Sequence, residues 1–174
     1  MPRYRRLVVT YDLAEAADAW ASAVVLHPHP DMGGDRFNNV VTALFEALPS
    51  VGVTAARFDF SSSNVDTAVA ETIEMLDVVS PEPRFVIGYS FGGGVAARVS
   101  DDRVAGRCLI APPPWKASRP EAYVIAAEHD QFFNVEDLQP DAVVTGADHF
   151  FAGRTDDVVR LVLTWLRDLP GAPH

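Results

Sequence analysis

Three short segments of this sequence contain residues that could carry out chemistry together. Ser90 lies in the pentapeptide Gly-Tyr-Ser-Phe-Gly, residues 128–130 read Glu-His-Asp, and His149 lies in Gly-Ala-Asp-His-Phe-Phe. Each segment follows a run of apolar residues. A serine hydroxyl becomes an effective nucleophile when a base takes its proton and a third group orients that base. The three segments could therefore supply a serine hydrolase site, provided that the fold brings them together.

The pentapeptide around Ser90 has the pattern of a turn between a strand and a helix. A β-branched and aromatic run at 85–87 stops at Gly88, and glycines at 92–94 lead into an Ala- and Val-rich segment. Glycines on both sides let the strand and the helix pass closely, and the serine takes a strained conformation that exposes its Oγ. The N–H of Phe91, at the positive end of the helix, is expected to donate to an oxyanion.

Short apolar runs alternate with helical patterns along the chain, which predicts a mainly parallel sheet with helices on both faces. The predicted strands are 4–12, 21–26, 53–58, 85–87, 104–111, 121–127 and 142–145. The predicted helices are 38–48, 65–79, the segment after Ser90, and 156–169. We expect 4–12 at an edge because of its arginines. We also expect Asp66, Glu71 and Glu74 on the outer face of 65–79.

In an open parallel sheet, the loops that follow the strands meet at one edge, which is where ligands bind. Ser90, the segment 128–130 and His149 all follow predicted strands. Their order along the chain, serine then acid then histidine, is that of the α/β-hydrolase fold rather than that of the chymotrypsin or subtilisin classes.

The combined motifs resemble a small α/β hydrolase. With His-Pro-His-Pro-x-x-Gly-Gly after the second predicted strand, the chain is similar to compact bacterial hydrolases that are distantly related to dienelactone hydrolases and acyl-peptidases. The resemblance covers most of residues 24–166 and implies a minimal α/β-hydrolase fold and a reaction class, but no substrate. It implies that Ser90 is the nucleophile, that His149 is the general base and acid, and that Asp130 orients the imidazole.

Two other carboxylates lie close enough in sequence to compete with Asp130. Glu128 is two residues away, and Asp148 is adjacent to His149. Asp148 is disfavoured because an adjacent residue seldom turns its carboxylate onto its neighbour's ring. We interpret His129 as a solvent-facing neighbour or as a second contact to the site.

The loop at 27–34 lies where the resemblance places the second oxyanion donor. Its prolines are expected to exclude regular structure and have no N–H to donate. The donor is therefore the backbone of His29, Asp31 or Met32, with His29 favoured by register. His27 and His29 could also form a metal pair, but no third or fourth ligand follows at a suitable spacing. We therefore expect neither a metal nor an organic cofactor.

Two departures from the resembled pattern concern the shape of the pocket. Related hydrolases often have Arg-Gly-x-Gly-x-Ser where this chain has the shorter segment 59–64. The connection at 112–120 is too short for a cap domain. These features predict an open, shallow site, and its candidate walls, which could equally be packing residues, are Trp115, Tyr89, Phe132 and Phe150.

The composition limits the class of protein. A chain of 174 residues with 48% hydrophobic and 22% charged residues fits one globular domain, 1–174. The formal charge of −10 argues against nucleic acid and anionic membranes as partners, because both need a basic face. Cys108 lies alone in an apolar run, so we expect it to be buried. Neither a signal peptide nor a membrane-spanning run is evident, which predicts a cytoplasmic protein.

These observations favour a serine hydrolase that cleaves a small ester or thioester through an acyl-enzyme on Ser90. A peptidase or amidase would use the same residues. A third hypothesis is a non-catalytic α/β-hydrolase scaffold that serves as a binding module. The retention of serine, acid and histidine together argues against the scaffold. The oligomeric state is left open.

Overall fold

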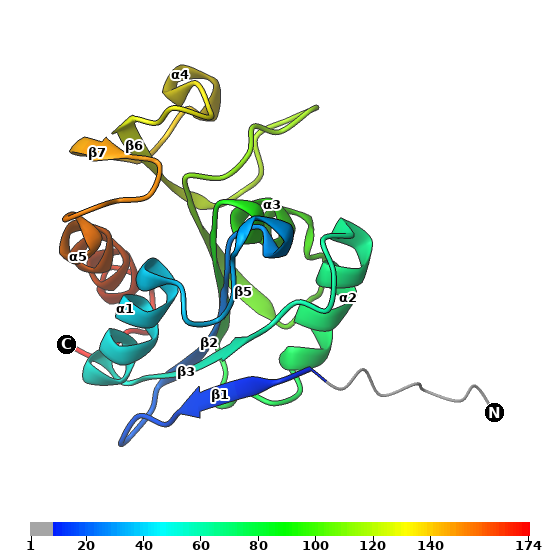
Figure 1. The fold of residues 1–174 in the computed structure, drawn as a ribbon. Helices are drawn as coiled ribbons and strands as arrows, with labels where there is room; N and C mark the ends of the chain where they lie inside the picture. Colours follow the sequence, from blue (N-terminus) through cyan, green and yellow to red (C-terminus); the bar gives the residue numbers. More distant parts are fainter. Residues whose placement is uncertain (1–8) are drawn as a thin grey trace.

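Within residues 9–174, the computed structural model shows seven strands in one sheet (Figure 1). The strands are β1 (Tyr11–Ala14), β2 (Ala21–Leu26), β3 (Val53–Phe58), β4 (Arg84–Tyr89), β5 (Val104–Ile110), β6 (Tyr123–His129) and β7 (Ala142–Asp148). Their order across the sheet is β1-β3-β2-β4-β5-β6-β7. β1 runs antiparallel to β3, and all other neighbours are parallel. The mainly parallel sheet is therefore confirmed.

Helices cover both faces of this sheet, as predicted. They are α1 (Asn39–Ala47), α2 (Val65–Met75), α3 (Phe91–Arg98), α4 (Val135–Leu138) and α5 (Thr155–Arg167), with short 3₁₀ turns η1 (Pro30–Met32) and η2 (Leu48–Val51). Buried residues of α1 and α5 belong to one core cluster, and those of α2, α3 and α4 belong to the other. Each helix therefore buries its apolar stripe against one face of the sheet.

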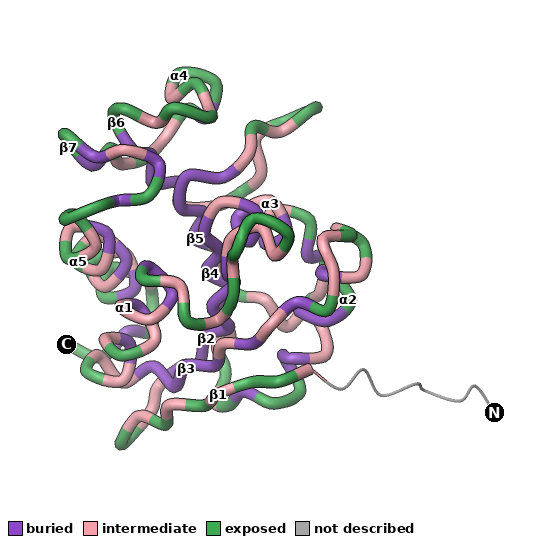
Figure 2. Tube along the Cα trace, viewed as in Figure 1, coloured by how far each residue is buried: buried purple, intermediate pink, exposed green. Residues whose placement is uncertain are grey.

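The central strands divide their side chains between the two faces with the period of two expected of a strand. In β2, Ala23 and Val25 face the α1/α5 side, whereas Val24 and Leu26 face the α2/α3 side. All six residues of β2 are buried, as are the last five of β4 and the last three of β5 (Figure 2). Cys108, in β5, is fully buried as predicted. This packing gives the site loops a rigid base.

Most predicted elements are present, and the differences lie at their ends. β2 and β3 have the predicted bounds, whereas β6 and β7 continue to His129 and Asp148, so both strands reach the candidate site. β1 lies at an edge, as predicted, but begins at Tyr11; residues 4–8 of the predicted strand lie outside the described residues. No helix within residues 9–174 has the length and apolar character needed to cross a bilayer.

Two predictions for the segment 65–79 are wrong. α2 ends at Met75, and the chain continues in tight turns in which each N–H donates to the carbonyl three residues earlier. Glu71 is fully buried instead of facing outward. It lies three residues after Ala68 and four before Met75, both on the buried stripe of α2. Its Oε2 accepts a hydrogen bond from the N–H of Ser61 (3.2 Å).

Candidate active site

Ser90 occupies the tight turn between β4 and α3. Its φ of 53° and ψ of −117° lie in a region that side-chain-bearing residues rarely adopt. The flanking glycines make this turn possible. A Cβ on Gly88 would lie 2.1 Å from the carbonyl oxygen of Gly92, and a Cβ on Gly92 would lie 2.5 Å from that of Leu26. The predicted strand–turn–helix arrangement is present, and it holds Ser90 at the carboxyl end of β4.

The structure brings Ser90, His149 and Asp130 into one chain of hydrogen bonds. Ser90 Oγ lies 2.9 Å from His149 Nε2, and His149 Nδ1 lies 2.7 Å from Asp130 Oδ2. A carboxylate accepts hydrogen bonds, so Nδ1 carries the imidazole proton and donates it to Asp130. Nε2 is then free to accept the hydroxyl hydrogen of Ser90. Three residues that are far apart in the sequence thus have complementary donors and acceptors.

Asp130 is held rigidly in its position next to His149. Its side chain is 1% exposed, and its second oxygen, Oδ1, accepts hydrogen bonds from the N–H groups of Phe132 (2.8 Å) and Phe133 (3.0 Å). Both carboxylate oxygens therefore have partners. This arrangement satisfies a buried charge and fixes the direction of Oδ2.

The competing acids point elsewhere. Glu128 Oε2 accepts a hydrogen bond from the N–H of Gly146 (2.6 Å), and Asp148 Oδ1 accepts one from the N–H of Phe150 (3.0 Å). Glu128 therefore binds the backbone of β7, and Asp148 binds the backbone of the loop that follows β7. The ring of His129 is largely exposed beside Glu128, so His129 is a solvent-facing neighbour of the site.

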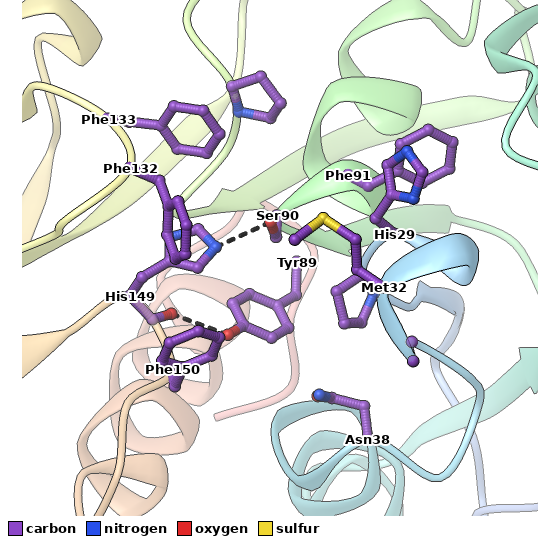
Figure 3. A pocket seen from close by; sticks show the side chains of 14 residues that line it. His29, Met32, Asn38, Tyr89, Ser90, Phe91, Phe132, Phe133, His149 and Phe150 are labelled. Carbon is purple, nitrogen blue, oxygen red and sulfur yellow. Dashed lines mark hydrogen bonds between the residues drawn. The ribbon is translucent and has the colours of Figure 1, made fainter.

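Further contacts fix the backbone of His149. The hydroxyl of Tyr89 donates a hydrogen bond to the carbonyl oxygen of His149 (2.8 Å), and Gln131 Oε1 accepts one from the N–H of His149 (3.0 Å). Burial, and then the negative charge of Asp130, raise the pKa of the Tyr89 phenol well above its usual value. Tyr89 therefore stays protonated and remains a donor. Figure 3 shows its bond to His149 below Ser90.

The loop at 27–34 contains regular structure, contrary to the sequence prediction. Residues 30–32 form the 3₁₀ turn η1, which tolerates Pro30 at its first position because the N–H there needs no partner. The backbone N–H groups at 31–34 all donate within the loop. Their acceptors are His29 Nδ1 for Asp31, the carbonyl of His29 for Met32 and Gly34, and the carbonyl of Pro30 for Gly33.

Two backbone N–H groups beside Ser90 are left without such bonds. The N–H of His29 has no hydrogen-bond partner among residues 9–174. The N–H of Phe91 is the first in α3, and N–H groups of a first helical turn have no intrahelical acceptor. The rings of His29 and Phe91 pack edge to face, with centroids 5.0 Å apart. Both residues line the pocket that contains Ser90.

His27 does not face the pocket and is not available to bind a metal. It is 1% exposed, its Nδ1 donates to the carbonyl of Pro28 (2.6 Å), and its Nε2 accepts from the N–H of Phe60 (3.0 Å). Both ring nitrogens are therefore occupied by backbone groups. Among residues 9–174, no group of three or more His, Cys, Asp or Glu side chains is arranged to hold a metal ion.

A cavity of about 340 Å³ opens next to Ser90 (Figure 3). Of the predicted walls, Tyr89, Phe132 and Phe150 line it. Trp115 does not line it; of its two predicted roles it has the second, because it packs against the core on the α2/α3 face. The lining residues are Pro28, His29, Met32, Gly33, Gly34, Asn38, Tyr89, Ser90, Phe91, Pro113, Phe132, Phe133, His149 and Phe150.

Several of these residues were not identified from the sequence. Asn38 appeared only as the first residue of the predicted helix 38–48, and Phe133 and Pro113 gave no signal beyond their apolar character. Gln131 directly follows Asp130, and nothing in its type indicates a bond to the backbone of His149. The proximity of Phe133 to Phe132, next to the acid, was the one available hint of an aromatic wall there.

Comparison with known proteins supports the assignment of the fold, although no family model matches the sequence. The uncharacterized protein RP471 of Rickettsia prowazekii is 23% identical over 87% of this chain and 81% of its own length. The solved structure of XC6422 from Xanthomonas campestris, an α/β serine hydrolase without a lid, is 25% identical, with a TM-score of 0.80 over 95% of this chain and 90% of its own.

A dienelactone hydrolase from Anabaena variabilis shares the same architecture. It is 14% identical, with a TM-score of 0.70 over 91% of this chain and 90% of its own. The resemblance inferred from the sequence motifs is thus confirmed at the level of the fold. Residues 9–174 have a compact α/β-hydrolase fold.

Proposed function

We propose that the chain is a serine hydrolase that cleaves a small carboxylic ester or thioester through an acyl-enzyme on Ser90. The observation that carries this proposal is the unbroken chain of hydrogen bonds from Ser90 through the ring of His149 to Asp130. It lies at the carboxyl edge of the sheet and opens to an accessible cavity. The likeness to a lidless serine hydrolase supports the same reaction class.

The first half of the reaction acylates Ser90. His149 Nε2 takes the hydroxyl proton while Oγ attacks the carbonyl carbon, and the carbonyl electrons move onto its oxygen. The backbone N–H groups of Phe91 and His29 would stabilise this oxyanion, and Asp130 stabilises the imidazolium. As the bond to the leaving group breaks, Nε2 returns the proton to the departing alkoxide or thiolate. The product is the alcohol or thiol.

The second half releases the acid. Nε2 of His149 takes a proton from a water molecule, whose oxygen attacks the acyl carbon. The same oxyanion donors stabilise the second tetrahedral intermediate. Its collapse breaks the bond to Ser90 Oγ, which recovers a proton from the imidazolium. The carboxylic acid leaves and the starting state of the enzyme is restored.

The contacts around the histidine serve both halves. His149 must point Nε2 first at Ser90 and then at the water, and its backbone is fixed on both sides by Tyr89 and Gln131. The phenylalanine rings at 132 and 133 pack edge-on against the imidazole, with centroids at 4.9 and 5.4 Å. A base held in this way needs little reorganisation during the reaction.

The size and lining of the cavity favour a small uncharged substrate. A volume of about 340 Å³ lies at the low end of the range of roughly 300–1,000 Å³ for small-molecule sites. The 14 described lining residues include no Asp, Glu, Lys or Arg. Apolar side chains therefore provide most of the contact surface.

Labelling with a fluorophosphonate tests the proposal directly. We expect intact mass to show a single adduct on the wild type and none on Ser90→Ala. Ser100→Ala, which changes an exposed serine beyond the end of α3, is the matched control and should label normally. Matched ester, thioester and amide substrates then identify the leaving group. Ester turnover that survives in Ser90→Ala would refute the proposal, as would an unlabelled wild type under conditions that label a control hydrolase.

A further inference from the structure

The side-chain amide of Asn38 can both accept and donate hydrogen bonds, and the fold uses only its acceptor oxygen. Its Oδ1 accepts hydrogen bonds from the N–H groups of Val40 (2.9 Å) and Val41 (3.3 Å) and so caps α1. Its Nδ2 has no hydrogen-bond partner among residues 9–174. The helix cap fixes the rotation of the amide, because Oδ1 must face the helix. The NH₂ group is consequently held in one direction.

That direction is toward the pocket. Asn38 lines the same cavity as Ser90, and Figure 3 shows its amide nitrogen extending from the start of α1 toward the side formed by Tyr89 and Phe150. In this view, Ser90 lies between that side and the side formed by Phe91 and Phe133. The amide is thus a hydrogen-bond donor placed apart from the two oxyanion donors. It is available to a part of the substrate other than the carbonyl that is attacked.

The charges nearby indicate what kind of acceptor this donor would meet. Arg36, two residues before Asn38, forms ion pairs with Asp12 and Asp59, and Arg57 pairs with Asp12 as well. The side chain of Arg36 is only 16% exposed. These cations are therefore already neutralised and do not line the cavity. A substrate carboxylate would lose its hydration there without gaining a counter-ion.

We propose that Asn38 is a specificity-determining residue that donates a hydrogen bond to an uncharged oxygen of the substrate, such as a ketone or an ether, away from the scissile carbonyl. The substrate class is then a small neutral ester or thioester with an apolar body and one such acceptor. Tyr89 and Phe150 provide the apolar surface around the acceptor. This inference rests on the proposed role of Ser90.

Two pairs of esters test the inference, one for each end of the substrate. p-Nitrophenyl pentanoate and p-nitrophenyl 4-oxopentanoate differ by a ketone in the acyl chain. Pentyl acetate and 2-ethoxyethyl acetate differ by an ether oxygen in the alcohol. In at least one pair, we expect the wild type to prefer the acceptor-bearing ester about fivefold to tenfold in kcat/KM, the effect of one hydrogen bond.

The variant Asn38→Asp separates recognition from helix capping. Aspartate caps a helix as well as asparagine does, but it replaces the NH₂ donor by an acceptor. We expect the preference ratio to fall to one or below, whatever happens to the absolute rates. Asn64→Asp makes the same change at the cap of α2, where Oδ1 accepts from the N–H of Thr67, and should leave the ratio unchanged.

The possible outcomes separate this inference from the proposed function. Ester turnover without a preference in either pair, or a preference that persists in Asn38→Asp, overturns the role of Asn38 alone. A wild type that hydrolyses none of the four esters and is not labelled at Ser90 overturns both. A preference that is present in the wild type and in Asn64→Asp, and lost in Asn38→Asp, supports the inference.

Discussion

Two buried histidines follow parallel strands of the same sheet, and their surroundings give them opposite properties. His27 follows β2 and is 1% exposed; His149 follows β7 and is 5% exposed. In both rings, each nitrogen has a hydrogen-bond partner. The two histidines are therefore alike in their burial, in their position after a strand and in having a hydrogen-bond partner at each ring nitrogen.

The partners of the two rings differ in what they allow the proton to do. His149 lies between a carboxylate and a hydroxyl, so it can take a proton from one side while the other side stabilises the resulting charge. His27 lies between a backbone carbonyl and a backbone N–H, neither of which can give or take a proton. Burial then lowers the pKa of His27. His27 therefore links two loops as a neutral ring, whereas His149 is placed to accept a proton from Ser90.

Paired glutamine substitutions should produce the largest contrast. His149→Gln removes the base, and we expect kcat/KM for an ester to fall by about 10⁴- to 10⁶-fold. His27→Gln keeps an acceptor near the N–H of Phe60 and loses the bond to Pro28, so the loop that contains His29 is disturbed. We expect its loss of activity not to exceed about 10²–10³-fold, the value of one oxyanion donor.

Initial-rate assays on both variants, with circular dichroism to verify folding, measure this contrast. Urea unfolding should show the reverse order, with the greater loss of stability in His27→Gln. Equal losses of activity in the two variants would show that the distinction between their surroundings is wrong.

Asp130→Asn tests the partner rather than the histidine. Oδ1 would still accept from the N–H groups of Phe132 and Phe133, so the new NH₂ group would face His149 Nδ1. Nδ1 must then accept, which moves the imidazole proton to Nε2 and blocks removal of the proton from Ser90. We expect kcat to fall by about 10⁴-fold. Asp148→Asn is the matched control and should lose far less, and a similar loss in both would contradict the assignment of Asp130.

The sequence identified the positions that the sheet determines. Ser90, Asp130 and His149 follow strands, and parallel strands place their following loops at one edge, so their meeting was predictable from the order of apolar runs. The bond from Tyr89 to the backbone of His149 was not predictable, because it spans 60 residues and depends on the path of the last loop.

The walls of the pocket depend on loops and were predicted less well. Trp115, whose type fitted either a wall or a packing residue, packs against the core. Asn38 was expected only at the start of a helix, and the direction of its free NH₂ group follows from the position of α1 beside Ser90. Glu71 is a different case. Its spacing from Ala68 and Met75 already placed it on the buried stripe, and its charge led to the wrong prediction.

The smallest effect we predict concerns the pH dependence of stability, and it isolates His27. Because burial lowers its pKa in the folded state, the unfolded chain takes up a proton near pH 6.5 that the folded chain does not. The free energy of unfolding should therefore fall as the pH drops below about 6.5, by at most about 1.4 kcal/mol per pH unit from this residue. The residue makes its full contribution above that pH.

Urea unfolding between pH 8 and pH 5 measures this slope, and the difference between the wild type and His27→Gln removes the contribution of other groups. Asp101 does not interfere, because its hydrogen bonds from Arg103 lower its pKa to about 2. The stability that Asp101 provides is present above its usual pKa of about 3.8 and is lost only as the pH falls from there toward 2.

A wild type and a His27→Gln variant with the same slope from pH 7 to pH 5 would mean that His27 becomes protonated in the folded state. The claim that burial keeps His27 neutral in the folded state would then be wrong, even if the activity assays distinguished the two histidines.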